Sequence, residues 1–401
     1  DLITLSDGSA TFVLSEDGLA GEVSGTPAID LADISLSGTF KAQLNTTRQT
    51  VSESLTVAGQ LVQLELDDGQ VGDGAAEYFR IQGTGAAIQL LGQEIGGNFT
   101  FEQATSTDGG GVIRGTIQGG HLSLGHDAQP RVAVTNAAGR ILISDMGVTG
   151  VMETATIDFD LGENIELQFA DTNLQYNTVT SPVQEYFITQ GGDAIPAGSF
   201  LRVEVPDATL SIADNDLTGA FAFEHYQDID GLDLLKVGAV DVGFSDAAQG
   251  VLENGQGGLV LLPSGAAGFV SGTIEVGSSP LQLEGDVLLR VNKTGVPVDE
   301  TIVVNGQTVQ LKFNDNETDL FEFSASDLTL KIGDFITIQG NVVFSESGGV
   351  DTFAGEGLSV FLGSGADFLS DGSLSPLATG VLISDAKIGL LRVPDEASYN
   401  W

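Results

Sequence analysis

Residues 283–311 read LEGDVLLRVNKTGVPVDETIVVNGQTVQL, and residues 36–64 read LSGTFKAQLNTTRQTVSESLTVAGQLVQL. At this constant spacing of 247 residues, 12 of the 29 positions are identical. A weaker copy lies between them, 132 residues after the first, and it keeps the Asn-Thr pair that begins at Asn177. Similarity that recurs at a fixed long period is the signature of a repeat architecture. A repeated unit, rather than any single motif, therefore decides the fold.

Strands with a central glycine set the length of this unit. They are IGGNFTFE at 95–102, LTGAFAFE at 217–224 and IQGNVVFSE at 338–346. Gly97, Gly219 and Gly340 are 122 and 121 residues apart, so the period is about that long. We predict three modules and the start of a fourth, at 1–138, 139–257, 258–379 and 380–401. The first module starts in mid-cycle, which predicts a window on a longer array.

Apolar and polar side chains alternate along these stretches. In 281–291 leucine, glycine and valine occupy every second position, with Gln282, Glu284 and Arg290 between them. A period of two is typical of half-buried strands, most often in antiparallel sheets. Asn305-Gly306 between two such runs predicts a tight hairpin, because both turn positions need positive φ. The sequence predicts an all-β fold of tandem antiparallel β-sandwich or meander modules in an elongated array, with a β-solenoid as the alternative.

Glycine also shapes the expected details. With 54 glycines in the chain helices should be scarce, and the best candidate is a short turn at 73–80. Glycine weakens a strand unless its missing side chain is needed. We therefore expect a bulge or bend at Gly97, Gly219 and Gly340 that lets a facing ring pack over the backbone. The aromatic side chains that follow these glycines are expected to point inward.

Charge and composition exclude several classes of partner. The chain has 56 Asp and Glu against 14 Lys and Arg, for a formal net charge of -42. Such an excess repels nucleic-acid phosphates and anionic membranes, so neither is an expected partner. No run of 18 apolar residues occurs, and we expect no membrane insertion. Cysteine is absent, which excludes disulfides and the common structural zinc sites.

Clusters of acids on glycine-rich segments are candidate Ca²⁺ sites, because that ion takes six to eight oxygen ligands. The candidate ligands are Asp67, Asp68 and Asp73; Asp228, Asp230 and Asp233; and Asp315 and Asp319. No cluster completes the helix-loop-helix pattern, and the nonapeptide of calcium-binding β-rolls is missing. Turns favour Asp and Asn in any case, so the alternative is that these residues only form turns. Calcium is the one cofactor that the sequence suggests.

No catalytic constellation recurs among the repeats. His121 and His126 are five residues apart, but no third ligand follows at a recognised metal spacing, so surface histidines are expected. A GxSxG elbow and a phosphate-binding loop are both missing. The acids shared by all three copies, Glu53, Glu185 and Glu300, are interpreted as solvated strand positions. We expect the chain not to be an enzyme.

NxT triplets, which are acceptors for glycans in secreted proteins, occur four times. They begin at Asn45, Asn98, Asn292 and Asn316. Asn45 and Asn292 occupy the same repeat position, which Asn177 also occupies without the triplet. We predict a structural amide at this position, whose side chain bonds its own backbone two residues on and ends the strand.

The repeated GxFxF strands, the Asn-Thr-Thr turn at 45–47 and turns such as GLAG at 18–21 resemble the very long tandem-repeat surface proteins of bacteria. These proteins are often exported by one-step secretion systems. The likeness is a general one that extends over the whole chain, which is acidic, cysteine-free and composed of predicted β-modules. It implies an extracellular adhesin, matrix or filament role.

We therefore expect a structural or adhesive segment of an extracellular repeat protein, such as a fibre, filament, stalk, surface coat or adhesin. Its expected partners are neighbouring copies or modules of the same protein, joined through strands at 1–8 and 381–391. The alternative is a carbohydrate-binding or polysaccharide-degrading extracellular protein, with surface polysaccharide as the partner. A binding surface of that kind would need a flat array of ordered polar or aromatic residues in the same place on every module.

Overall fold

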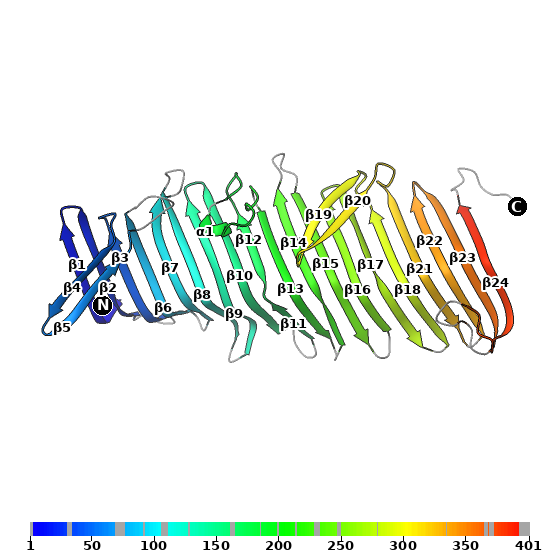
Figure 1. The fold of residues 1–401 in the computed structure, drawn as a ribbon, viewed down its shortest axis with the longest axis horizontal. Coiled ribbons are helices and arrows are strands. Elements are labelled where there is room, and N and C mark those ends of the chain that lie inside the picture. The colour runs from blue at the N-terminus through cyan, green and yellow to red at the C-terminus, as the bar shows by residue number, and fades with distance from the viewer. Residues whose placement is uncertain are drawn as a thin grey trace. The chain divides into compact units, whose positions relative to one another are not determined.

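The structure is a computed structural model of all 401 residues. It describes residues 3–29, 34–68, 77–90, 93–105, 111–126, 129–160, 165–184, 186–198, 200–212, 215–227, 233–246, 250–278, 280–333, 335–364, 368 and 373–392. Strands make up nearly all of these ranges, so the all-β prediction is confirmed (Figure 1). The chain divides into two compact units, Asp1–Val203 and Glu204–Trp401, called unit 1 and unit 2 below.

Unit 1 is an antiparallel meander with one hairpin and one short helix added to it. Its elements are β1 (Ile3–Ser15), β2 (Gly18–Ile29), β3 (Ile34–Asn45), β4 (Val51–Val57), β5 (Gln60–Leu66), β6 (Tyr78–Leu90), β7 (Gln93–Thr105), β8 (Gly111–His126), β9 (Gln129–Ser144), β10 (Gly147–Asp160), β11 (Ile165–Ala170), β12 (Asn173–Asn177) and α1 (Tyr186–Thr189). Strands β1, β2, β3, β6, β7, β8, β9 and β10 pair in that order. Both β11 and β12 pair with β10, so they act as one interrupted strand. The hairpin β4–β5 forms a ladder of its own.

Unit 2 repeats this plan. It contains most of β13 (Phe200–Ile212), then β14 (Asn215–Gln227), β15 (Asp233–Asp246), β16 (Gly250–Leu262), β17 (Gly265–Ser278), β18 (Leu281–Asn292), β19 (Val298–Val304), β20 (Gln307–Phe313), β21 (Leu320–Ile332), β22 (Ile336–Ser347), β23 (Val350–Ser364) and β24 (Thr379–Arg392). Strands β14 to β18 and β21 to β24 pair in order, all antiparallel. The hairpin β19–β20, predicted from Asn305-Gly306, is confirmed and lies across β14 to β17 (Figure 1).

The sequence repeat corresponds to a cycle of six strands of the main sheet. After the third strand of each cycle the chain leaves this sheet and then returns to it, and we call the segment that leaves the sheet an excursion. The excursion is the hairpin β4–β5 in the first cycle, the segment that carries α1 in the second, and the hairpin β19–β20 in the third. The predicted boundaries at 138/139 and 257/258 fall inside β9 and β16. Pairing of β8 with β9 and of β15 with β16 therefore carries the ladder from one cycle to the next. The division into three modules stays a prediction.

Of the predicted arrangements (sandwich, meander or solenoid), the structure has the antiparallel meander. Within the described ranges the sheets that pack on it are the two-stranded hairpins β4–β5 and β19–β20, which do not make a sandwich. The ladders given above are antiparallel, unlike those of a parallel solenoid. The helical turn predicted at 73–80 is not observed where the chain is described, because Tyr78–Arg80 begin β6. The strand expected at 381–391 lies within β24.

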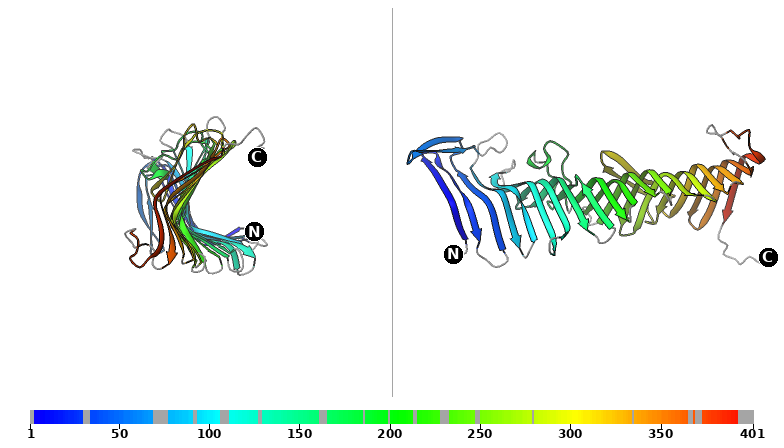
Figure 2. Two further views of the ribbon diagram at one scale, coloured as in Figure 1. Left: turned by 90° about the vertical axis from the view of Figure 1, so that its right-hand side faces the viewer. Right: turned by 90° about the horizontal axis from the view of Figure 1, so that it is seen from below.

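The central glycines mark a row of β-bulges, as expected. The ladder register shifts at Gly97, Gly219 and Gly340, and the first and last have φ of 147° and 136°. Figure 2 shows that the long strands are bent rather than straight. The expectation that an aromatic ring packs over these glycines is wrong for Gly97, because a Cβ there would lie 3.0 Å from the Cα of Gly120. The neighbouring strand's backbone, rather than an aromatic ring, needs this space.

The sheet has two unlike faces, because residues paired across strands share a face and successive residues alternate. We call the face under the hairpins the excursion face; it carries the small residues Ala20, Ala222 and Ala267, all fully buried. We call the other face the phenylalanine face. It carries Phe79, Phe101, Phe221, Phe223, Phe323 and Phe344.

Candidate functional site

Three asparagines at the predicted repeat position fasten the excursions to the sheet. Asn45, Asn177 and Asn292 are each at most 1% exposed at the end of the third strand of a cycle. The Oδ1 of each accepts a hydrogen bond from the backbone N–H two residues on, at 3.0, 2.9 and 3.0 Å. The prediction of a structural amide is confirmed. Burial also leaves Asn45 and Asn292 inaccessible to glycosylation in the folded chain.

The other end of each amide reaches across the excursion. In the first copy the Nδ2 of Asn45 donates to the carbonyls of Gln49 at 2.8 Å and Asp67 at 2.7 Å. Asn292 likewise donates to Val296 at 3.0 Å and to Glu317 at 2.9 Å. One side chain thus joins the start of the excursion to its return. These amides can donate and accept at once, which neither a carboxylate nor a hydroxyl could reproduce in full.

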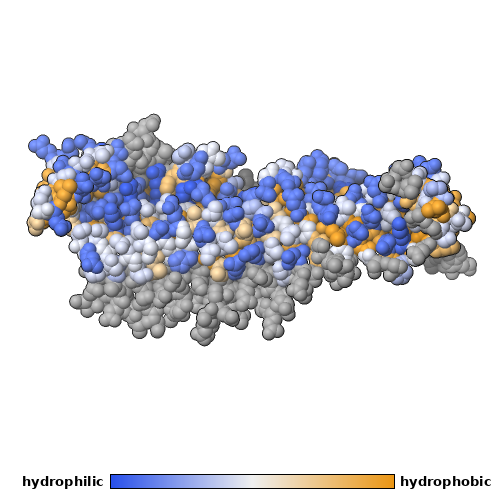
Figure 3. Space-filling view, turned by 60° about the horizontal axis from the view of Figure 1, so that its bottom comes forward, coloured by the Kyte–Doolittle hydropathy of each residue, from blue (hydrophilic) through white to orange (hydrophobic). Residues whose placement is uncertain are grey.

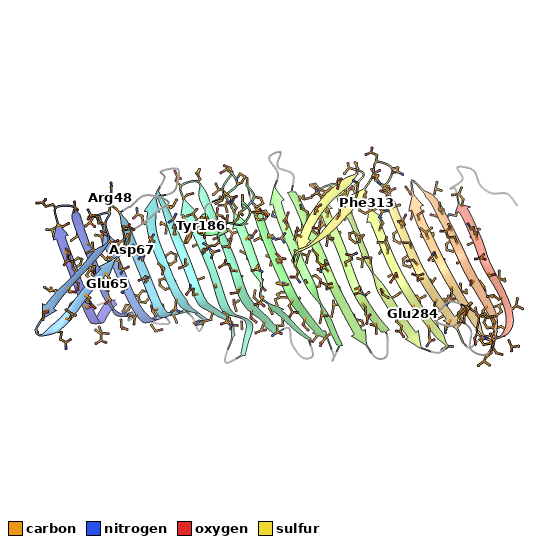
Figure 4. All side chains as sticks on the ribbon, in the orientation of Figure 1. Arg48, Glu65, Asp67, Tyr186, Glu284 and Phe313 are labelled. Carbon is orange, nitrogen blue, oxygen red and sulfur yellow. The ribbon has the colours of Figure 1, made fainter. Side chains whose placement is uncertain are left out.

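Basic residues on the excursion face form a second set of anchors. Arg80 on β6 donates to Glu102 at 2.6 Å and to Asp67 at 3.0 Å. Asp67 lies where the hairpin β4–β5 returns to the sheet (Figure 4). In unit 2, Arg290 donates to Glu317 at 2.9 Å and to the carbonyl of Lys312 at 3.1 Å. Hydrogen bonds between ionised partners are the stronger kind.

Arg140 does the same for the middle copy. Its guanidinium binds both carboxylate oxygens of Glu153, at 2.8 and 2.6 Å, and reaches the carbonyl of Ile188 in α1 at 3.2 Å. An arginine therefore fixes the excursion with α1 to β9 and β10, just as Arg80 and Arg290 fix the two hairpins to the sheet. The sequence did not predict α1 or this anchor, since Arg140 has no basic counterpart at the matching residues of the other copies.

Lys236 on β15 is the most enclosed of these cations. Its ammonium lies 3.1 Å from Glu224 and 3.2 Å from Glu300, and it donates to the carbonyl of Thr301 at 3.3 Å. The interpretation of Glu300 as a merely solvated strand position is therefore wrong, because a cation from a distant strand holds it. Glu53 is exposed, as that interpretation expects, and Glu185 lies outside the described residues.

The predicted acidic clusters are only partly described. Asp73, Asp228 and Asp230 lie outside the described residues, as does the side chain of Asp233, whose backbone pairs with Gln227. Asp67 binds Arg80, and Asp68 is the last described residue of this segment. Across the described part of the chain, no three His, Asp or Glu side chains gather as a metal site would require. Calcium binding stays a prediction.

The cluster at 314–319 is held by protein groups. Asp319 lies 2.5 Å from the ammonium of Lys293, and Asp315 is exposed. Glu317 accepts from the backbone N–H of Asn314 at 2.7 Å and from Arg290. Burial would raise the pKa of Glu317, but these hydrogen bonds and the charge of Arg290 outweigh it and lower the pKa. The carboxylate therefore stays charged to a more acidic pH than usual.

The phenylalanine face is only partly covered. Phe101 and Phe223 occupy the same repeat position and are each 42% exposed, and Phe344, their counterpart in β22, is 37% exposed. The expectation that these rings point inward is thus wrong; their parity is as predicted, but the hairpins cover the opposite face. On this same face a hollow of about 260 Å³ lies above Gly268, lined by Leu259, Val270, Leu289 and Val291.

Two histidines can be placed. His121 and His225 both lie on strands and both interact with other residues, while the side chain of His126 is outside the described residues. None of the described helices is long and apolar enough to cross a membrane.

Comparison of the sequence with models of protein families and with curated proteins finds no match.

Proposed function

We propose that this chain is a structural or adhesive segment of an extracellular repeat protein, in a fibre, filament, stalk, surface coat or adhesin. The observation that carries the proposal is the ladder between cycles, formed where β8 pairs with β9 and β15 with β16. Backbone hydrogen bonds hold consecutive repeats together without needing a specific pocket. A chain built in this way gains sheet with every added repeat and presents the same two faces again.

The charge of the chain supports the same role. A net charge of -42 keeps a protein with a partly exposed apolar face soluble through mutual repulsion. Hydrophilic residues dominate the surface that Figure 3 presents, with small hydrophobic patches between them. The few basic residues of the excursion face are used to fasten excursions, as described for Arg80, Arg140 and Arg290.

Electron microscopy of the native material, with antibody labelling of intact cells, tests this proposal. We expect the antibody to label the outer surface, on fibres or on a continuous coat. Recovery of the protein only from the cell interior would overturn the extracellular part. Dispersed single particles that bind polysaccharide would overturn the structural part.

One observation favours the second candidate, a carbohydrate-binding surface. Phe101, Phe223 and Phe344 recur at the same place in every cycle, and each is partly exposed on the phenylalanine face of its own unit. Aromatic rings with an apolar face are common contacts for ligands. Retention on immobilised polysaccharides would support this function if the triple substitution to alanine abolished it. Equal retention of the variant would exclude these rings as the binding surface.

Calcium belongs to the proposal as a ligand of the acidic segments. Asp67 of the first cluster and Asp315 of the third are exposed, and Asp68 is half-buried. Added Ca²⁺ is expected to raise the melting temperature of the chain, and chelator to lower it again. A melting temperature that neither treatment changes would contradict calcium binding.

A further inference from the structure

The two hairpins have corresponding apolar faces, but only one of them is fully covered. At the spacing of 247 residues, Leu55 corresponds to Ile302 and Val57 to Val304, both near the hairpin tip. Ile302 and Val304 are 1% and 0% exposed, whereas Leu55 and Val57 are 57% and 53% exposed. The base of both hairpins is buried, including Leu64 and its counterpart Leu311. The difference therefore concerns the tip alone.

Strands β14 and β15 cover the tip in unit 2. They contact β19, and β15 also contacts β20. The fit depends on small residues: a Cβ on Gly238 would lie 2.6 Å from side-chain carbons of both Ile302 and Val304. Ala220 and Ala222 of β14 belong to the same buried cluster. A strand pair with small residues at these positions is thus what the hairpin tip requires.

In unit 1 the hairpin overhangs the margin of its sheet. Hairpin β4–β5 contacts β1 and β2 through β5, and its tip extends beyond β1 (Figure 1). Among the described residues β1 pairs along one edge only, with β2. Its counterpart β16 pairs along both edges, with β15 and β17. The backbone groups of an unpaired edge are a template for another strand.

The charge on hairpin β4–β5 also fits a strand pair like β14–β15. In unit 2, Glu300 of β19 pairs with Lys236, which β15 contributes. Glu53 corresponds to Glu300 and lies exposed in the overhanging hairpin. A strand that added to β1 in the register of β15 would bring a lysine to this carboxylate. Apolar contact, free strand edge and charge therefore all indicate one partner.

We propose that the free edge of β1 and the overhanging tip of β4–β5 form a docking site for two antiparallel strands of the β14–β15 kind, from a further copy of this repeat. One strand takes the place of β15: it extends the sheet at β1 and lies under Leu55 and Val57. The second takes the place of β14, pairing with the first and covering the rest of the hairpin tip. The site rests on contacts within the repeat, so it stands whether or not the protein is extracellular. If the proposed function also holds, this is the joint through which repeats are added.

A peptide of residues 215–246, labelled with a fluorophore, tests the site on the intact 401-residue chain. We expect saturable binding and a rise in melting temperature of the chain. A peptide with Gly238→Leu and Ala222→Leu is expected to bind at least about 10-fold more weakly, because the added side chains occupy the space that the hairpin tip needs. Absence of binding by the unsubstituted peptide, or equal binding of both peptides, would overturn the proposal.

Variants of the chain give an independent check. The double variant Leu55→Ser, Val57→Ser changes side chains already exposed, so its melting temperature without peptide should equal that of the unmodified chain. We expect it to lose at least about 10-fold in affinity for the peptide. Leu61→Ser is the matched control, since Leu61 is 64% exposed and its counterpart Thr308 is polar and exposed. Loss of affinity in Leu61→Ser equal to that of the double variant would refute the assigned surface.

Discussion

Asn292 and Thr294 close the turn that leads from the sheet into hairpin β19–β20. The Oδ1 of Asn292 accepts from the backbone N–H of Thr294 at 3.0 Å and from its hydroxyl at 2.8 Å. The same pair of bonds joins Asn45 to Thr47, at 3.0 and 2.7 Å. Because both asparagines are fully buried, water cannot replace these bonds. The amide is therefore a structural requirement of the repeat.

Asn292→Ala is expected to destabilise unit 2 strongly. The substitution leaves the buried N–H of Thr294 and the carbonyl of Glu317 without their partner, and the carbonyl of Val296 keeps only the hydroxyl of Thr294 as a donor. We expect a loss of about 3 kcal/mol in the free energy of unfolding, from denaturant titration followed by circular dichroism. Asn316→Ala, on the surface, is the control and should change it by less than about 0.5 kcal/mol. Similar losses in both variants would contradict the assigned role.

Lys236→Met tests the cation that holds hairpin β19–β20. Without the ammonium, Glu224 and Glu300 would lose the cation that they share, so hairpin packing should weaken. We expect about 2 kcal/mol of destabilisation, less than for fully buried pairs because Glu300 retains some exposure. Lys312→Met is the control, because its pair with Asp299 is exposed and contributes little. Equal stability of the two variants would show that Lys236 is dispensable.

Local features of this fold could be predicted from the sequence, because they depend on residues close together in the chain. The hairpin at Asn305-Gly306 and the amide of Asn45 are examples, since turn geometry and a bond to the second residue on are set locally. Bulges at Gly97 and Gly340 belong to the same class. Each is determined by the backbone conformation of a few consecutive residues.

Features that depend on distant strands could not be predicted. Alternation reveals that a strand has two unlike faces, but it does not reveal which face a hairpin will cover. The inward orientation predicted for Phe101 and Phe223 is wrong for this reason, since the excursions pack on the opposite face. The partner of Glu300 could not be identified either, since Lys236 is 64 positions earlier in the chain. The sequence offered one signal for this pair. Lys236 is a lysine in a chain with many acidic residues, and its position in β15 has the parity that places it on the excursion face.

Acid should weaken the corner around Glu317. Its pKa is lower in the folded chain than the ordinary value of 4.5, so its contribution to stability is fully present above about pH 4.5 and is lost as pH falls through the folded pKa. Glu317→Gln should cost about 1 kcal/mol at neutral pH, measured by denaturant titration. The difference from the unmodified chain should shrink below pH 4.5. A difference that stays constant with pH would contradict the predicted ionisation.

Gly238→Ala tests how closely hairpin β19–β20 packs on β15. The new Cβ would lie 2.6 Å from the side chains of Ile302 and Val304, so the hairpin must lift or its side chains must leave their preferred rotamers. Overpacking of this kind costs about 1–3 kcal/mol. Gly243→Ala on the same strand is the matched control, because its Cβ would meet the hydroxyl of Thr218 at an ordinary 3.5 Å. Thermal unfolding of both variants should show a lower melting temperature for Gly238→Ala only. An equal change in both would mean that the effect comes from the strand backbone, and that the hairpin does not depend on the missing side chain.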